Sequence, residues 1–365
     1  MSFAPQALID HAALRHNLRR VREAAPNSRV WAVIKADAYG HGVERVARSL
    51  DQTDGYAVAR VEEGLRLREA GFDKPVLVLG GCHTPDELMR AAQQGFELAL
   101  HQHHQLSLLD ALPAETPPLT LWLKVDTGMH RLGFEPGMVT GIAERMSAHP
   151  RVGALNLLTH LANADDPADS ATATQIGRFD ALPLDHFGYS SIANSAGILA
   201  FKQSHRDWVR PGIMLYGVSP FVGGRAESDG LRPVMTLRSR VVAVKQAKQG
   251  DPVGYGGRYR CPEDMPIAVV AAGYGDGYPR HAADGTPVLV GGRRLPLIGR
   301  VSMDLITLDA SSFPHVQVGE EAILWGQGLP AEEVAEHAGT IAYQLFCNVS
   351  SRVAFIDLNL EPEEG

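Results

Sequence analysis

The segment VWAVIKADAYGHG, residues 30–42, places a lysine directly after an apolar run. Lys35 ends that run, and Tyr39 follows four residues later. A lysine amine that is withdrawn from water can act as a nucleophile and forms Schiff bases with carbonyl groups. A lysine that stands alone is more often a surface residue, with its aliphatic chain on the protein and its amine in water. The chemistry of this lysine therefore depends on the polar residues that the fold brings to it.

Polar side chains follow later apolar runs in the same way. They are Arg131 after LTLWLKV, His160 at the end of NLLTH, Asn194 and Ser195 after YSSIA, and Arg210 in WVRPGIMLY. The strands of one parallel barrel end at the same mouth, so we expect these side chains to face one pocket together with the lysine.

The same segments offer groups that bind phosphate. NSAG, from residue 194, predicts a helix start, where free N–H groups attract an anion, and RPGIMLYG offers the backbone N–H groups of Gly212 and Ile213. Tyr39 can add a hydroxyl. A lysine beside a phosphate site is the arrangement that a pyridoxal 5'-phosphate (PLP) enzyme requires. Gly-rich turns are also common as plain turns, so the residues alone leave both interpretations open.

Short apolar runs recur eight times between residues 30 and 216. They are VWAVI, YAVA, VLVLG, ELAL, LTLWLKV, VGALNLL, FGYSSIA and WVRPGIMLY. Segments with helical spacing lie between most of them, such as TPDELMRAAQQG, in which Thr84 can cap a helix that begins at Pro85. Alternating strands and helices predict a parallel sheet, and eight such units predict a (β/α)8 TIM-type barrel of the α/β class. No GxGxxG follows the first strand, which argues against a dinucleotide-binding sheet.

The pattern changes after Gly217. FVGGRAESDGLRP is a Gly-rich polar linker, and the segments beyond it alternate apolar and polar residues between Gly and Pro turns. One short helical segment, PAEEVAEHAG, interrupts them. The sequence therefore predicts a barrel domain over residues 1–228 and a mainly β domain over residues 229–365.

The composition indicates a protein that handles small molecules. The 365 residues are 45% apolar, and the net charge of -8 comes without long blocks of one sign, which argues against nucleic-acid or membrane partners. We recognise no secretory leader or spanning segment and expect a cytoplasmic protein. Cys82, Cys261 and Cys347 are widely spaced and predict neither disulfides nor a zinc site. HQHH at residues 101–104 lacks carboxylate or cysteine ligands, so it is interpreted as a solvated turn and no metal is expected.

Five motifs together resemble the alanine racemase family of fold-type III PLP enzymes. They are VIKADAYGHG, LKVDTGMHRLGF, VRPGIMLYG, GYGGRY and GRVSMD, and the resemblance covers nearly the whole chain. It implies a barrel, a mainly β second domain, PLP as the cofactor, and a homodimer in which each active site uses both subunits. It also implies racemisation of alanine, which supplies D-alanine for peptidoglycan in the cell wall.

The resemblance assigns roles to individual residues. Lys35 carries the cofactor as a Schiff base, and residues from several segments hold its phosphate: Tyr39, Ser195, Gly212, Ile213 and Tyr343. Racemisation removes a proton from one face of Cα and delivers one to the other, so two acid/base groups are needed. The resemblance makes Lys35 one of them and Tyr255, from the partner subunit, the other.

A free tyrosine has a pKa of about 10, so a tyrosine base needs positive charge nearby. The resemblance places His160 against the phenolic oxygen of Tyr255, and Arg131 near His160 and the substrate carboxylate. Taken alone, His160 is more readily explained as a core histidine, and Tyr255 as part of a Gly-rich turn.

Two further cationic residues have roles that the resemblance implies. Arg210 faces the pyridine nitrogen of the cofactor, and because an arginine keeps its proton, the ring stays neutral and side reactions such as transamination are disfavoured. Lys124 matches a lysine that can be carbamylated, which would orient Arg131. An ion pair between Lys124 and Asp126 is the alternative.

Residues of the second domain complete the resemblance. Met303 and Asp304 resemble residues at the substrate carboxylate, and Tyr274 resembles a gate in the access path. Other functions stay open at this point: a broad-specificity amino-acid racemase, a fold-type III decarboxylase with a cysteine acid in its second domain, or a non-catalytic PLP carrier. A carrier of this fold type is a bare barrel, so the second domain with Tyr255 argues against it.

Overall fold

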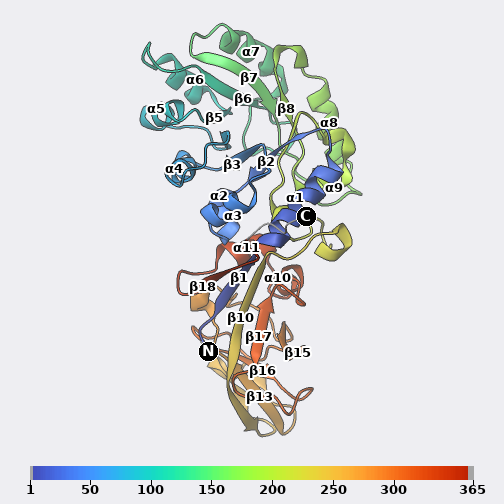
Figure 1. Ribbon diagram of the computed structural model, residues 1–365. Coiled ribbons are helices and arrows are strands. Elements are labelled where there is room, and N and C mark those ends of the chain that lie inside the picture. Colours follow the sequence, from blue (N-terminus) through green and yellow to red (C-terminus); the bar gives the residue numbers. More distant parts are fainter. Residues whose placement is uncertain (1–2, 361–365) are drawn as a thin grey trace.

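Eight parallel strands close into a barrel in the computed structural model, which describes residues 3–360 (Figure 1). Each strand pairs with the next and the last pairs with the first: β2 (Arg29–Val33), β3 (Gly55–Val58), β4 (Val76–Val78), β5 (Glu97–Leu100), β6 (Leu119–Lys124), β7 (Val152–Leu158), β8 (Ser190–Ser191) and β9 (Trp208–Val209). All eight overlap the predicted apolar runs, so the predicted barrel is confirmed.

Helices accompany the strands around the outside of the barrel. They are α1 (His11–Ala24), α2 (Lys35–Gly40), α3 (Val43–Ser49), α4 (Val61–Glu69), α5 (Pro85–Gln93), α6 (His103–Asp110), α7 (Val139–Ser147), α8 (Ala171–Asp180) and α9 (Ser195–Ala200). The predicted start of α5 is confirmed, because Thr84 Oγ1 accepts the Glu87 N–H at 3.2 Å and Pro85 is the first helical residue. Within residues 3–360 no helix is both long and apolar enough to cross a membrane.

The HQHH segment leads into a helix, so its interpretation as a solvated turn is wrong. α6 begins at His103, and His101 is buried just before it. Nε2 of His101 lies 2.9 Å from the Gly80 carbonyl oxygen, and Nε2 of His104 lies 3.0 Å from the His83 carbonyl oxygen. In the described part of the chain no group of three or more His, Cys, Asp or Glu side chains is placed to hold a metal ion.

The second domain is built on a mixed sheet of eight strands. They are β1 (Gln6–Asp10), β10 (Met235–Ala247), β13 (Met265–Val270), β14 (Pro287–Val290), β15 (Arg293–Pro296), β16 (Ile306–Asp309), β17 (Glu321–Trp325) and β18 (Ala354–Leu358). The order is β15-β14-β17-β10-β1-β18, with β13 paired to both β10 and β16, while β11 (Pro252–Val253) and β12 (Tyr259–Arg260) form a separate ribbon. β1 pairs with β10 and β18, so residues 6–10 belong to this sheet and the chain then enters the barrel through α1.

Two helices accompany this sheet, whereas the sequence predicts one. α10 (Ala331–His337) is the predicted helix, and α11 (Ala342–Cys347) is the additional one. α11 lies against α2 of the barrel domain and carries Tyr343 to the barrel mouth, where the ring of Tyr343 is 5.7 Å from that of Tyr39. The second domain thus contributes one helix to the mouth of its own barrel.

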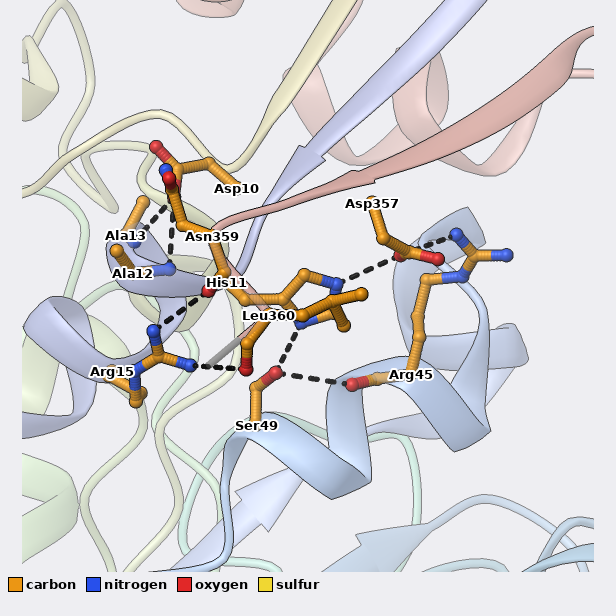
Figure 2. A network of polar contacts seen from close by, with 10 residues as sticks. All are labelled: Asp10, His11, Ala12, Ala13, Arg15, Arg45, Ser49, Asp357, Asn359 and Leu360. Carbon is orange, nitrogen blue, oxygen red and sulfur yellow. Dashed lines mark hydrogen bonds and ion pairs between the residues drawn. The ribbon is translucent and has the colours of Figure 1, made fainter. Parts of the chain in front are cut away.

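A polar network joins the two domains (Figure 2). Oδ1 of Asp357, in β18, lies 2.8 Å from Nε2 of His11 and 2.8 Å from Nη1 of Arg45, and Nδ1 of His11 contacts Ser49 Oγ. His11 is fully buried, and both its ring nitrogens have partners. The network ties α1 and α3 to the last strand of the second domain, and α3 directly follows the segment that holds Lys35.

The two ends of the barrel differ in filling. Where the strands begin, Trp31 stacks on Trp208 with ring centroids 4.2 Å apart, and Trp122 meets Trp31 edge-on at 6.3 Å. Beside them a cavity of about 820 Å³ is lined by Arg29 and Glu97, among others. The predicted site residues lie at the opposite end, where the strands end, so this cavity is not the predicted site.

Candidate active site

Lys35 lies at the mouth formed by the ends of the barrel strands. It comes two residues after the end of β2 at Val33, so the prediction that Lys35 ends the strand is displaced by two residues. Ala36–Tyr39 then adopt left-handed helical conformations, with φ between 51° and 54°. This conformation costs an L-residue about 1–2 kcal/mol. The turn must therefore be held by its surroundings, as strained segments at functional sites commonly are.

Contacts on both sides fix the left-handed turn. Asp37 Oδ1 accepts the N–H of Val43, which attaches the turn to the start of α3 at 3.0 Å. Gly40 has a φ of 75°, and a Cβ there would lie 2.2 Å from the carbonyl oxygen of Phe346 in α11. Glycine is required at this position because α11 approaches so closely. The AYG part of the motif therefore serves the packing of α11 on the turn.

Cationic side chains gather around the Lys35 amine. Electrostatic coupling links five basic side chains, of which His160 is the neutral one described below: Lys35, Lys124, Arg131, His160 and Arg210. Burial is the largest cause that lowers the pKa of Lys35; Arg131 lowers it further, Glu63 opposes the decrease, and Arg210 adds to it. Among the described residues no carboxylate forms an ion pair with Lys35 or Arg131. A pocket with this excess of positive charge favours anionic ligands.

Arg210 is buried and held rigidly. Its Nη2 donates to the carbonyl oxygens of Thr159 at 2.5 Å and Ile192 at 3.2 Å and lies 3.5 Å from Nδ1 of His160, while Nη1 donates to Ser191 Oγ. Burial lowers its pKa to about 10, so the guanidinium stays protonated near neutral pH. Its Nε–H has no partner within residues 3–360 and is available to a ligand.

His160 is neutral near pH 7. Burial lowers the pKa of His160 well below its ordinary value, and the charges of Arg210, Lys124 and Arg131 lower it further. With Arg210 donating toward Nδ1, the ring proton is expected on Nε2. The positive charge at this site therefore comes from the arginines and lysines, and His160 offers a neutral N–H donor.

Lys124 is only 8% exposed and forms no ion pair with any residue that the structure describes. Burial, followed by the charges of Arg210 and Arg131, lowers its pKa to about 8. Asp126 forms no ion pair with it, because the Asp126 carboxylate accepts the N–H groups of Gly128 and His130 at 3.0 Å each. A sizeable fraction of the Lys124 amine is thus neutral at slightly alkaline pH, which is the form that reacts with carbon dioxide.

A small cradle of donors lies beside the lysine turn. Ser195 Oγ accepts the N–H groups of Gly212 at 2.9 Å and Met214 at 3.3 Å, which leaves its own proton free to donate. The Ile213 N–H lies between these two groups in the chain and has no acceptor in the described structure. A Cβ on Gly212 would lie 2.7 Å from the Tyr39 hydroxyl oxygen, so the tyrosine closes the cradle directly over this glycine.

Two tyrosines of the cradle remain neutral hydroxyl donors. The rings of Tyr39 and Tyr343 are 5.7 Å apart between centroids. Burial raises the pKa of Tyr343 to about 12 and raises the pKa of Tyr39 still more. Neutral hydroxyls, free N–H groups and nearby cations form a donor set that suits a phosphate group, and the PLP cofactor fits this end of the barrel.

The predicted residues of the second domain lie on exposed loops. Tyr255 is 70% exposed and Met303 is 51% exposed. The Tyr274 loop adjoins the Met303 loop, since the Gly275 N–H donates to the Met303 carbonyl oxygen at 2.8 Å, and Asp304 pairs with Arg352 at 2.6 Å. None of the contacts within residues 3–360 joins Tyr255, Met303 or Asp304 to Lys35.

Two residues near Lys35 are absent from the sequence prediction. Glu63 in α4 and Cys347 in α11 both act electrostatically on the Lys35 amine. The helical segment around Glu63 has no distinctive sequence motif. Its one signal is that Glu63 comes three residues after Arg60, which is the spacing of a capping box. Cys347 lies at the end of a helix that the sequence pattern does not reveal.

Comparisons with known proteins identify the family of the chain. Residues 9–220 match the family model described as alanine racemase, N-terminal domain, and residues 234–356 match that of the C-terminal domain. The chain is 50% identical over 350 residues to the alanine racemase of Nitrosococcus oceani. The matched region covers 96% of this chain and 98% of the relative. It is also 50% identical over 367 residues to that of Halorhodospira halophila, covering 100% of this chain and 99% of the relative.

Solved structures give the same result. The biosynthetic alanine racemase of Pseudomonas aeruginosa superimposes with a TM-score of 0.95 at 40% identity, over 98% of this chain and 100% of that chain. The alanine racemase of Bartonella henselae with covalently bound pyridoxal phosphate superimposes with a TM-score of 0.87 at 28% identity, over 97% of this chain and 99% of that chain.

Proposed function

The chain belongs to the alanine racemase family, and we propose that it interconverts L- and D-alanine through two bases, Lys35 and the Tyr255 of a partner subunit. The observation that carries the two-subunit part is the contrast between a buried cationic mouth around Lys35 and an exposed Tyr255 in the other domain. The enzyme is PLP-dependent, as its family is.

The barrel mouth offers a group for each part of PLP. Lys35 would hold the cofactor covalently, and the phosphate would meet the hydroxyls and N–H groups of the cradle: Tyr39, Ser195, Gly212, Ile213 and Tyr343. Arg210 would bond the ring nitrogen through its free Nε–H, and because arginine keeps its proton the ring would remain neutral. When bound, PLP supplies an electron sink that makes the α-hydrogen of the amino acid acidic.

Lys35 and Tyr255 would carry the α-proton on opposite faces of Cα. Burial and the neighbouring arginines lower the pKa of Lys35, which favours the neutral amine that a base requires. Tyr255 would meet the Nε2–H of neutral His160 and the positive field of Arg131 and Arg210, which stabilise a phenolate. A positive environment on one side and a buried amine on the other would bring both bases toward neutral working pH.

The sheet geometry argues that Tyr255 serves another subunit. β10 starts next to β1 at the barrel side and runs for 13 residues, which is roughly 40 Å at the rise of a strand (Figure 1). Tyr255 follows β11, whose Val253 packs with Ala247 at the far end of β10. A two-fold dimer in which each second domain covers the other barrel would complete two identical sites.

The remaining predicted residues fit the same arrangement. Met303 and Asp304 would reach the substrate carboxylate from the partner together with Arg131 of the barrel, and Tyr274 would line the access path. Carbamylation of Lys124 would turn a buried cation into an anion beside Arg131. We further propose that the enzyme works in the cytoplasm, which suits its three free cysteines, and that its D-alanine serves peptidoglycan.

Mixing two inactive variants tests the shared site. Lys35→Ala lacks the barrel base and Tyr255→Phe lacks the partner base. Random exchange of subunits makes half of the dimers mixed, and each mixed dimer holds one intact site, so racemisation should recover to about a quarter of the wild-type rate. Chiral chromatography of alanine measures the rate, and two different affinity tags show that the subunits exchange.

No recovery in dimers that carry both tags would mean that each site lies within one chain. Borohydride treatment and peptide mapping of the wild-type enzyme check the barrel half separately, since the cofactor should be trapped on Lys35. Trapping on Lys124 or another lysine would contradict the assignment. Assays of the other L-amino acids measure the substrate range beyond alanine.

A further inference from the structure

The peptide group after Lys35 is held by a side chain from a different barrel unit. Oε1 of Glu63, in the first turn of α4, accepts the N–H of Ala36 at 2.7 Å. Oε2 of the same carboxylate accepts the N–H groups of Ala59 at 2.6 Å and Arg60 at 3.2 Å. A single carboxylate therefore joins the chain that leaves β2 to the chain that leaves β3.

Ala36 is the point at which this contact matters most. It is the first of the left-handed residues after Lys35, and the N–H groups that begin a helical turn have no acceptor inside it. β2 and β3 are neighbours in the barrel, paired at Val33 and Ala57, so both chains emerge side by side. Without Glu63, three N–H groups at this edge would lose their acceptor, and the strained turn would lose its link to the barrel.

The charge of Glu63 also faces the lysine. It raises the pKa of Lys35, whereas burial, Arg131 and Arg210 lower it. Cys347 raises the pKa of Lys35 as well, and Lys35 in turn lowers the pKa of Lys124 and of His160. Among the described residues Glu63 is the carboxylate with the strongest electrostatic effect on Lys35.

We propose that Glu63 is a positioning residue for Lys35: its carboxylate fixes the left-handed turn against β3 and so sets the direction in which Lys35 enters the barrel mouth. The inference rests on the proposed function of Lys35. Glu63 touches neither the reacting atoms nor the cofactor cradle in this arrangement, and it acts through the Ala36 peptide.

Glu63→Gln is the first test, because glutamine has only one acceptor oxygen for three N–H donors. Deuterium exchange of the Ala36 amide in the holoenzyme should become roughly tenfold faster, since local opening of the turn becomes easier. The value of kcat should fall by roughly tenfold or more, while KM for alanine stays within about twofold. The visible circular dichroism of the bound cofactor should weaken, because that signal reports how rigidly the ring is held.

Glu62→Gln is the matched control. Glu62 is the preceding residue of α4 and is exposed, and within residues 3–360 its one ion pair is with Arg90, at 3.7 Å. The Glu62→Gln substitution removes one negative charge from the same helix turn. It should leave the Ala36 amide exchange, kcat and the visible circular dichroism unchanged. If Glu63→Gln behaves like Glu62→Gln in all three measurements, the positioning role is wrong.

Glu63→Asp covers the case in which the glutamine variant does not fold. Aspartate keeps the charge and the capping position but is one methylene shorter, so it cannot bridge both chains. Faster exchange at Ala36 with the cofactor still trapped on Lys35 supports the proposal. Wild-type exchange and kcat in Glu63→Asp overturn it. Trapping of the cofactor on another lysine would instead contradict the proposed function of Lys35, whatever the exchange at Ala36.

Discussion

The barrel mouth and the loops of the second domain are built in opposite ways. At the mouth, Arg210 has four polar contacts and Ser195 Oγ accepts two N–H groups, so the side chains are fixed before any ligand arrives. On the second domain, Tyr255 and Met303 extend into solvent and are 70% and 51% exposed. One region is closed and strongly positive, and the other is open.

The two regions are therefore suited to different tasks. A fixed, water-poor and positive mouth is suited to holding an anionic cofactor and tuning pKa values. Tyr255 and Met303 lie exposed on the second domain of one chain, and a partner subunit that covers them is the arrangement we propose. We therefore expect one chain to bind the cofactor with its own barrel mouth and α11, and the loop around Tyr255 to work only against a partner.

Tyr255→Phe should give the largest effect and tests this division directly. Loss of one positioned acid/base group should slow racemisation by roughly 10²–10⁴-fold. The cofactor should still bind with unchanged absorbance, because its proposed contacts, Tyr343 of α11 included, belong to the same chain as Lys35 and do not involve Tyr255. The family resemblance implies that the tyrosine takes the proton from L-alanine, which leaves Lys35 to act on D-alanine. Exchange of the D-alanine α-proton in deuterated water should therefore persist in Tyr255→Phe.

Tyr259→Phe is the control, because it removes a hydroxyl from the neighbouring strand β12 in the same region. It should leave both exchange reactions at wild-type rates. If Tyr255→Phe exchanges L-alanine as fast as the wild type does, Tyr255 is not the base for the L face. Loss of cofactor from Tyr255→Phe would instead contradict the separation of the two halves.

The sequence predicts the barrel better than it predicts the details of its mouth. Eight apolar runs followed by polar residues are enough to bring Lys35, His160 and Arg210 together, because the topology of a closed barrel leaves their strand ends no other place. The left-handed turn at Ala36–Tyr39 could not be predicted, since alanine and tyrosine have no preference for that conformation. Tertiary contacts impose it, mainly from α11 and α4.

Short elements, and residues whose partners lie far away in the chain, are also not predicted from the sequence. α11 has six residues and no side-chain cap, so its hydrophobic pattern is too short to separate a helix from a strand. β1 lies in the second sheet although it comes first in the chain, and only its pairing with β10 and β18 reveals this. Glu63 has no distinctive motif, because its partners Ala36 and Ala59 are backbone groups that any sequence offers.

Gly212→Ala should have an intermediate effect, confined to the barrel half. A new Cβ on Gly212 would lie 2.7 Å from the Tyr39 hydroxyl oxygen, so the substitution should displace that hydroxyl. Displacement of that hydroxyl should weaken retention of PLP by about tenfold, equivalent to about 1.4 kcal/mol. Dialysis followed by titration with PLP measures the affinity.

Two comparisons sharpen the Gly212→Ala result. Gly141→Ala lies in α7, where a new Cβ meets nothing within 4 Å, and it should leave PLP affinity unchanged. Tyr39→Phe removes the clashing oxygen, so its cost should be smaller in the Gly212→Ala background than in the wild type. Equal costs in both backgrounds would show that Gly212 and Tyr39 do not share one cradle.

Lys124→Met should act on stability and not only on activity, as a shift in melting temperature. The folded-state pKa of Lys124 is about 8, below the roughly 10.4 of an unfolded lysine. Below pH 8 the folded protein therefore holds a buried, unpaired cation, a cost on the order of 3 kcal/mol. Between pH 8 and about 10.4 the unfolded chain binds more protons than the folded protein does, so this cost disappears as the pH rises.

Methionine has a similar length and no charge, so cofactor-free Lys124→Met should melt a few degrees above the wild type at pH 7 in buffer free of carbon dioxide. The difference in Tm should shrink toward pH 10, and Lys35 does not disturb it because both proteins keep that lysine. Bicarbonate should raise the Tm of the wild type alone if Lys124 is carbamylated.

The control is Lys248→Met in the second domain, where an exposed lysine pairs with Asp264 at 2.8 Å and its pKa is raised by that hydrogen bond. A raised pKa means that this pair stabilises the fold below the pKa, so Lys248→Met should lower Tm slightly at pH 7. A gain in Tm for Lys124→Met that is the same at pH 7 and pH 10 would mean that the gain does not come from removing a buried charge. Charge repulsion at the barrel mouth would then not be a difference between the barrel and the second domain.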